Sequence, residues 1–169
     1  MKPAEIINEL EKNAIVFKNL FSNISTEHSK WRLSEKKWSL LEIVCHLYDE
    51  EIKDFKPRLE KILNEDSDWN PIDPQGWVIS EKYSEKKFLI TVESFISERK
   101  KSVEWLKNLE VIDWNIKAVH LKFGEFTAYQ MLCNWLAHDY LHMRQIVKLK
   151  YHMLESGLSI EKLGYAGEW

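Results

Sequence analysis

The sequence of 169 residues lacks a basic excess, a long apolar run and internal repeats. Its net charge is −3, so it offers no basic surface for the phosphates of nucleic acid. No apolar run approaches the length of a membrane span, and the first residues contain no signal-peptide core. We therefore expect a cytoplasmic protein that binds neither nucleic acid nor membrane. No low-complexity tract separates two domains, and we expect a single domain over residues 1–169.

Cysteine is scarce as well. Cys45 and Cys133 both fall in predicted helices, and we interpret them as reduced, buried small side chains. The composition, 44% hydrophobic and 30% charged, is typical of a soluble globular protein. The eight tryptophans are a high number. Several fall in predicted connections, where they line a pocket or, as we prefer, close the ends of loops: Trp31, Trp69, Trp77 and Trp114.

Apolar residues recur with helical spacing in four stretches, which predict long amphipathic helices at residues 3–22, 39–63, 84–109 and 127–157. Two of these helices begin with a capping box, formed by Ser39 with Glu42 and by Thr127 with Gln130. We expect the second helix either to kink at Pro57 or to run on through it. The pattern predicts an all-α four-helix bundle with long ordered connections and a short C-terminal extension.

Two connections have a character of their own. Residues 64–83 are polar and aromatic, which predicts a long ordered loop, and loops of this length are often functional. Ser84, which follows, is the expected cap of the third helix. Residues 110–125 alternate in part like a strand and contain His120, for which we favour a surface or loop-packing role over a ligand role.

Three histidines are candidate metal ligands. His138 and His142 lie one turn apart on the fourth helix, so their imidazoles can converge on one point, although ordinary buried histidines would show the same short motif. His46 lies on the polar margin of the second helix, where a solvated histidine would look the same. Bundles build metal sites from side chains on facing helices. Three neutral imidazoles suit Zn, Ni, Fe or Cu better than Mg or Ca, and they leave a position open for water or substrate.

Two acidic residues are candidates for supporting these histidines. Asp49 lies one turn from His46 and is our candidate for a second shell or a base, while a solvated helix charge is the alternative, as it is for Glu50. Asp139 falls within the apolar face, where an ionised carboxylate needs hydrogen-bond partners. We predict that Asp139 accepts from a neighbouring helix or a ligand imidazole. Its direction differs by about 100° from that of His138, which disfavours direct metal binding.

Two stretches carry a recognisable pattern: WSLLEIVCHLYDEE at residues 38–51 and FGEFTAYQMLCNWLAHDYLHMRQI at residues 123–146. They resemble the DinB/YfiT superfamily of small metal-dependent bundle proteins, in the same order and over nearly the whole chain. The resemblance implies a divalent metal bound by His46, His138 and His142. It also implies frequent homodimers and, in several branches, the transfer of low-molecular-weight bacterial thiols such as bacillithiol or mycothiol.

Other branches of the superfamily are described as hydrolases, and the long loops carry no signature of one branch. We expect a metal-dependent transferase of a low-molecular-weight thiol onto small electrophiles, with Zn, Ni or Fe as the metal. The alternatives are a metal-dependent hydrolase and a non-catalytic, stress-associated metal-binding bundle. No serine or cysteine nucleophile is visibly placed, so an enzyme here must depend on its metal. We expect the aromatic loop from Trp69 to Trp77 to cover an apolar electrophile and keep water out.

Overall fold

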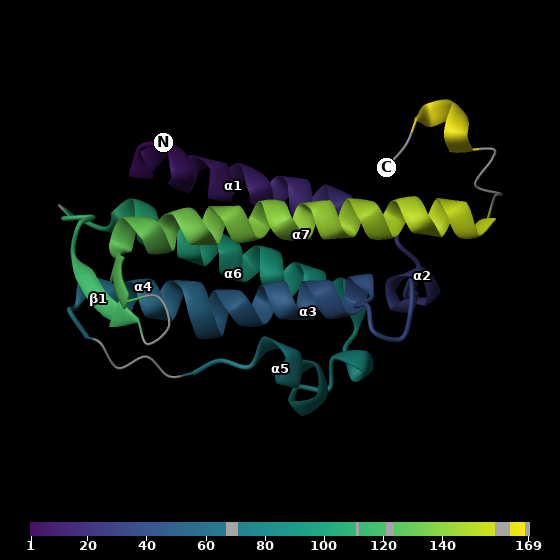
Figure 1. The fold of residues 1–169 in the computed structure, drawn as a ribbon, viewed down its shortest axis with the longest axis horizontal. Helices are drawn as coiled ribbons and strands as arrows, with labels where there is room; N and C mark the ends of the chain where they lie inside the picture. Colours follow the sequence, from purple (N-terminus) through teal and green to yellow (C-terminus); the bar gives the residue numbers. More distant parts are fainter. Residues whose placement is uncertain (67–70, 111, 121–123, 158–162, 168–169) are drawn as a thin grey trace.

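The computed structural model describes residues 1–66, 71–110, 112–120, 124–157 and 163–167. Four long helical segments lie side by side (Figure 1). Three of them are single helices: α1 (Pro3–Leu20), α6 (Phe88–Asn108) and α7 (Ala128–Gly157). The fourth is continuous through three elements: α3 (Leu40–Glu50), η1 (Glu51–Phe55) and α4 (Lys56–Leu63). The predicted four-helix bundle is confirmed. Among the described residues, none of the helices has both the length and the apolar character that crossing a membrane requires.

The three connections between the long helical segments, residues 21–39, 64–87 and 109–127, each contain short elements of their own. α1 and α7 run in one direction, whereas α3–α4 and α6 run in the other (Figure 1). α1 and the α3–α4 segment each pack against both α6 and α7. Because α4 ends at one end of the bundle and α6 begins at the other, their connection has to return along its length. This return carries α5 (Pro74–Ser80), which packs against α3, and the short turn η2 (Tyr83–Glu85). Trp69 lies outside the described residues.

The remaining elements close the ends of the bundle. α2 (Thr26–Lys30) lies at one end, and the antiparallel hairpin of β1 (Lys117–His120) and β2 (Gly124–Thr127) lies at the other (Figure 1). The strand-like alternation in this connection therefore reflects a true hairpin. The short turn η3 (Gly164–Ala166) follows α7.

Both predicted capping boxes are present. The backbone N–H of Gln130 donates to the Thr127 hydroxyl at 3.0 Å, and that of Thr127 donates to the Gln130 side chain at 2.8 Å. Ser39 and Glu42 make the same reciprocal pair at the start of α3. The expected cap at Ser84 is wrong, because Ser84 lies in η2 and α6 begins only at Phe88.

The second long helical segment accommodates Pro57 with a π-helical turn, which is wider than an α-helical turn. Proline has no N–H for the carbonyl four residues earlier, and its ring clashes with that carbonyl in a regular α-helix. Here a π-helical turn, η1, immediately precedes the proline, and the helix continues to Leu63. Such turns are often found at functional sites.

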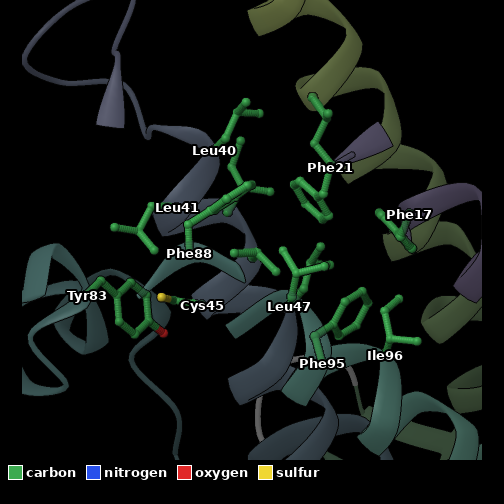
Figure 2. Packing of buried hydrophobic residues seen from close by; sticks show 14 of the residues in the cluster. Phe17, Phe21, Leu40, Leu41, Cys45, Leu47, Tyr83, Phe88, Phe95 and Ile96 are labelled. Atoms are coloured by element: carbon green, nitrogen blue, oxygen red, sulfur yellow. The ribbon is translucent and has the colours of Figure 1, made fainter. Parts of the chain in front are cut away.

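Two apolar clusters fill the bundle. The first surrounds Phe17, Phe21 and Phe95 near the α2 end, where the rings of Phe17 and Phe95 meet edge to face at 5.3 Å (Figure 2). The second contains Leu10 and Trp135 and lies nearer the hairpin. Between the two clusters, each long helical segment contributes one buried polar residue to a shared hydrogen-bond network. We call these four residues the polar layer: Asn13, Glu51, Arg99 and Asp139.

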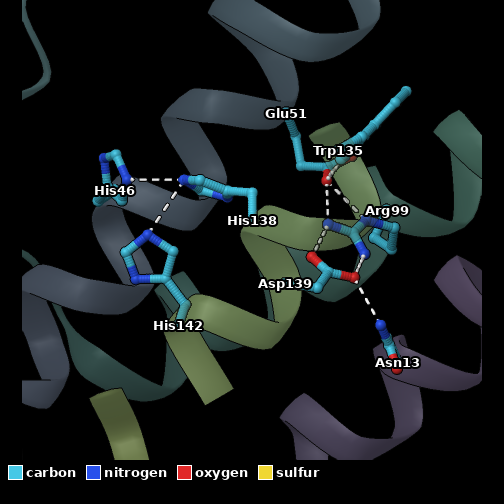
Figure 3. A network of polar contacts seen from close by, with 8 residues as sticks. All are labelled: Asn13, His46, Glu51, Arg99, Trp135, His138, Asp139 and His142. Atoms are coloured by element: carbon cyan, nitrogen blue, oxygen red, sulfur yellow. Dashed lines mark hydrogen bonds and ion pairs between the residues drawn. The ribbon is translucent and has the colours of Figure 1, made fainter. Parts of the chain in front are cut away.

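The polar layer joins all four long helical segments through one buried guanidinium. Arg99 on α6 donates to both oxygens of Asp139 on α7, at 2.6 and 2.7 Å, and its Nε donates to Glu51 at 2.6 Å (Figure 3). Asn13 on α1 donates to Asp139 at 2.9 Å, and the Trp135 indole donates to Glu51 at 2.9 Å. None of the four residues is more than 4% exposed. The bonding partners thus specify how the four segments align.

Replacing Arg99 with Met should destabilise the fold strongly. The change leaves two buried carboxylates without their counter-charge, which costs about 3–5 kcal/mol of unfolding free energy. Urea unfolding of the metal-free protein measures this loss. Arg144→Met on the exposed face of α7 is the control, and it should stay within about 0.5 kcal/mol of the wild type. A loss below about 1 kcal/mol for Arg99→Met would contradict the role of the polar layer.

Candidate metal centre

Three histidine rings from two antiparallel helices meet beside the polar layer. The Nε2 atoms of His46 and His142 lie 3.2 and 3.0 Å from the Nε2 atom of His138 (Figure 3). We call these three residues the histidine cluster. One ligand atom from each lies within 4.8 Å of the others. The sequence-predicted candidates are therefore brought together, whereas His120 lies on β1 and is not part of the cluster.

Helix geometry and the polar layer together explain why His138 and His142 face His46. His138 and His142 are four residues apart on α7 and so lie on one side of it. Asp139, the next residue after His138, points to the opposite side and is held by Arg99 (Figure 3). Because the polar layer fixes Asp139, it also fixes the rotation of α7 that turns His138 toward His46 on α3. Asp139 accepts hydrogen bonds from Asn13 and Arg99 of the polar layer and not from a histidine of the cluster.

The two nitrogen separations that involve His138 fit a shared cation. A tetrahedral metal with bonds of about 2.0–2.1 Å to imidazole holds two such nitrogens roughly 3.3 Å apart. The observed separations of 3.2 and 3.0 Å are close to this value. The Nδ1 of His142 lies 2.8 Å from the side-chain oxygen of Gln145, which accepts a hydrogen bond only if Nδ1 carries the proton. That tautomer leaves the Nε2 lone pair of His142 directed at the cluster.

Burial keeps the rings neutral. Burial, with the neighbouring His142 as the next cause, lowers the pKa of His46 to about 3 and that of His138 to about 2. The pKa of His142 is also lowered, again mainly by burial. Metals bind the neutral imidazole, so these rings are available as ligands at neutral pH without first losing a proton.

Glu50 is the acidic side chain that approaches the cluster. Its carboxyl oxygen lies 3.6 Å from Nδ1 of His46, a nitrogen that is buried and has no hydrogen-bond partner. Burial raises the pKa of Glu50 to about 9, with a hydrogen bond to Asp54 as the next cause. Metal-binding histidines commonly donate their second N–H to a carboxylate, and Glu50 is placed to accept this bond.

Asp49, the sequence-based candidate, lies elsewhere. It accepts from the Tyr83 hydroxyl at 2.6 Å and pairs with Lys53 at 3.2 Å. Spacing favoured Glu50 equally, since it lies four residues from His46 and Asp49 lies three. The sequence gives little reason to choose between them, because both lie within one turn of the histidine.

Aromatic side chains enclose the cluster. The ring of Trp38 lies 4.9 Å from that of His46, and the ring of Phe55 in η1 lies 5.0 Å from that of His138. The ring of Trp77 instead contacts the Lys53 ammonium, which lies 5.0 Å from the ring centre. The sequence patterns did not indicate that Trp38 and Phe55 contact the histidine cluster, or that Gln145 contacts His142. For Gln145 a signal was available, namely its place three residues after a ligand candidate.

Each histidine of the cluster should be necessary for metal binding. We expect protein purified without an affinity tag to carry one divalent transition metal per chain, and His46→Ala, His138→Ala and His142→Ala to lose it. Elemental analysis measures the metal, and circular dichroism checks that helicity is retained. His152→Ala is the matched control, because His152 lies on the same helix but pairs with Glu155. Stoichiometric metal in the His142→Ala protein would contradict the site.

Lowering the pH should destabilise the metal-free protein through His138. Its folded pKa is about 2, far below the ordinary value of 6.5. Above pH 6.5 both states are neutral and no stability is lost. As the pH falls below that value the unfolded chain binds a proton that the folded chain does not, at a cost of about 1.4 kcal/mol per pH unit.

Urea unfolding of metal-free wild type and His138→Gln, from about pH 7 down to pH 4, isolates this effect. The variant lacks the titrating ring, so wild type should lose stability relative to it by about 1.4 kcal/mol for each pH unit below about 6. A stability difference that does not change with pH would show that the ring is not buried in its neutral form.

Comparisons with known proteins agree with the resemblance seen in the sequence. No curated protein sequence matches this chain significantly. Among solved structures, YfiT from Bacillus subtilis, described as a probable metal-dependent hydrolase with an unusual four-helix bundle topology, matches with a TM-score of 0.79. The two chains are 16% identical, and the match covers 90% of this chain and 87% of that one, so it shows a common fold. A family model for the DinB superfamily matches residues 9–146, and the chain therefore belongs to that superfamily.

Proposed function

We propose that the histidine cluster binds Zn, Ni or Fe as a divalent ion, and that the protein is a metal-dependent transferase of a low-molecular-weight thiol onto small electrophiles. The observation that carries the proposal is the convergence of three neutral imidazoles, with the Nε2 atoms of His46 and His142 at 3.2 and 3.0 Å from that of His138 and one ligand atom of each ring within 4.8 Å of the others. Three protein ligands leave at least one position for a substrate atom, which is the usual arrangement of a catalytic site. A bound ion would supply Lewis acidity, which lowers the pKa of a thiol or water placed beside it.

The protein's own groups favour a nucleophile brought by a cosubstrate. Cys45 is buried, and its pKa is raised to about 12 chiefly by that burial, so it supplies no thiolate at neutral pH. Glu50 approaches the cluster from the Nδ1 side of His46, away from the point where the Nε2 atoms converge. It can orient His46, but it is not placed to take a proton from a nucleophile at the convergence point. Asp49 and Asp139 are held by other partners.

These positions favour thiol transfer over hydrolysis. Hydrolysis of an ester or amide benefits from a protein base that takes a proton from water. A thiol has a far lower pKa than water and ionises near a cation without such a base. The rings of Trp38 and Phe55 against the cluster also limit the access of bulk water.

Hydrolysis is the second candidate. It is favoured by the fold shared with YfiT, which is described as a probable metal-dependent hydrolase. A non-catalytic metal-binding bundle is the third. The homodimer implied by the resemblance stays a prediction.

The deciding assay offers metal-loaded protein the electrophile monochlorobimane together with bacillithiol, mycothiol, glutathione or no thiol. We expect thiol-dependent conversion by the wild type that is lost in His46→Ala and kept in the control His152→Ala. The same preparations are then given p-nitrophenyl acetate without thiol. Turnover of the ester alone would favour the hydrolase, and inactivity in both assays with metal firmly bound would favour the non-catalytic bundle.

A further inference from the structure

A cavity of about 250 Å³ lies directly beside the histidine cluster, on the side of the β-hairpin. His138 forms one edge of it, and the rest of the lining comes from η1, α4, the hairpin and α7. The α7 residues Met131, Asn134, His138 and Leu141 are three or four positions apart, so they share one side of the helix. A molecule in this cavity would therefore contact a proposed metal ligand.

The β-hairpin supplies a second wall of the cavity. His120 on β1 and Phe126 on β2 lie on the same face of the hairpin as Ala118, which is buried in the second apolar cluster. The rings of His120 and Phe126 are 6.3 Å apart. The hairpin is tied to the start of α7, because the backbone N–H of Ala128 donates to the Ile116 carbonyl at 3.0 Å. This face of the hairpin is therefore held against the bundle.

The carboxylate and the guanidinium of the lining, Asp54 and Arg58, pair with each other, and both side chains are only 12% exposed. Their opposite charges compensate, so the pair presents no net charge to the cavity. The amide of Asn134 is engaged within α7, where it donates to the Gln130 carbonyl at 2.8 Å. A charged ligand would lose its hydration here without gaining a counter-charge from the pair. The lining therefore favours an uncharged ligand.

Phe55, at the end of the π-helical turn η1, forms an apolar wall between the cavity and the core. Its ring stacks on Trp135 at 5.6 Å with an interplanar angle of 9°, and it lies 5.0 Å from the ring of His138. Phe55 and Met131 are 7% and 5% exposed, whereas Leu141 is 54% exposed. The cavity thus has a buried apolar floor and an exposed apolar rim.

From these features we propose that the cavity binds the apolar, uncharged body of the electrophile, with Phe55 and Phe126 as its aromatic walls. The inference rests on the proposed function, because it assigns a substrate class to the same site. A volume of about 250 Å³ holds roughly eight water-sized groups of about 30 Å³ each, which is about the size of one substituted aromatic ring. A larger electrophile would extend past Leu141 into solvent. The role that the sequence suggested for the loop from Trp69 to Trp77 thus passes to other aromatic residues.

Methyl NMR of the metal-free, full-length protein tests the inference. The chain has four methionines, and Met131 lines the cavity. With ¹³C in the methionine methyl groups, benzyl alcohol should shift the Met131 signal through the ring current of its phenyl group, with a Kd of about 1 mM. The signals of Met143 and Met153 are internal controls and should stay in place, because these side chains pack against the first apolar cluster. The variant Met131→Leu assigns the signal.

Charge and access to the cavity are tested next. Benzylammonium has nearly the shape of benzyl alcohol but carries a charge, and it should bind at least about tenfold more weakly. Leu141→Trp should fill the exposed rim and weaken benzyl alcohol by about tenfold or more. Leu154→Trp is the matched control, since Leu154 is 61% exposed on the same helix and lies outside the cavity lining. Ala137→Phe is a second variant at an exposed position of the lining, and circular dichroism checks that each variant folds.

A second experiment connects the cavity to the reaction. In metal-loaded protein, benzyl alcohol should compete with monochlorobimane and raise its KM, and Leu141→Trp should raise this KM while the metal content stays the same. Absence of thiol-dependent conversion in the wild type would defeat the proposed function. The titration of the Met131 signal in the metal-free protein would still decide whether the cavity takes an uncharged apolar ligand.

Three results would overturn the inference. The first is a Met131 signal that benzyl alcohol leaves unchanged. The second is binding that is equally tight for benzylammonium, or that stays unchanged in both Leu141→Trp and Ala137→Phe. The third is conversion of monochlorobimane that benzyl alcohol does not inhibit.

Discussion

The buried guanidinium of Arg99 donates to carboxylates on two of the other three long helical segments. Apolar side chains alone would let the four long helices slide and rotate against one another, since many packings bury similar areas. Arg99 removes that freedom because its bonds to Asp139 and Glu51 must all be made inside the protein. A buried ion pair contributes little net stability when compared with apolar packing, but losing one partner is costly. The polar layer therefore acts mainly on the alignment of the helices.

This alignment has a direct consequence for chemistry. His138 and Asp139 are neighbours on α7, so the residue that is fixed and the residue that is proposed to bind metal share one stretch of backbone. On the opposite helix, Glu51 of the polar layer opens the π turn and Phe55 closes it. On each of these two helices, residues that align the bundle are therefore direct neighbours of residues that form the candidate site.

Much of this arrangement could be predicted from the sequence, and the limits have physical causes. The capping boxes at Ser39 and Thr127 are local, so spacing alone predicted them. The approach of His46 to His138 depends on how two helices pair, and it was expected mainly through the family resemblance. The partners of Asp139 could not be identified, because Asn13 and Arg99 come from helices far away in sequence. Asp49 was preferred over Glu50 because helical spacing alone does not show which of two adjacent carboxylates a neighbouring element will engage.

X-ray absorption spectroscopy of metal-loaded protein, purified without an affinity tag, can identify the ligands of the ion. With zinc bound by the histidine cluster, we expect nitrogen or oxygen scatterers at about 2.0–2.1 Å and the outer-shell signature of about three imidazoles. In His142→Ala the imidazole signature should disappear together with the metal. A spectrum dominated by oxygen without imidazole scattering, or one unchanged by removal of His142, would show that the histidine cluster does not hold the ion.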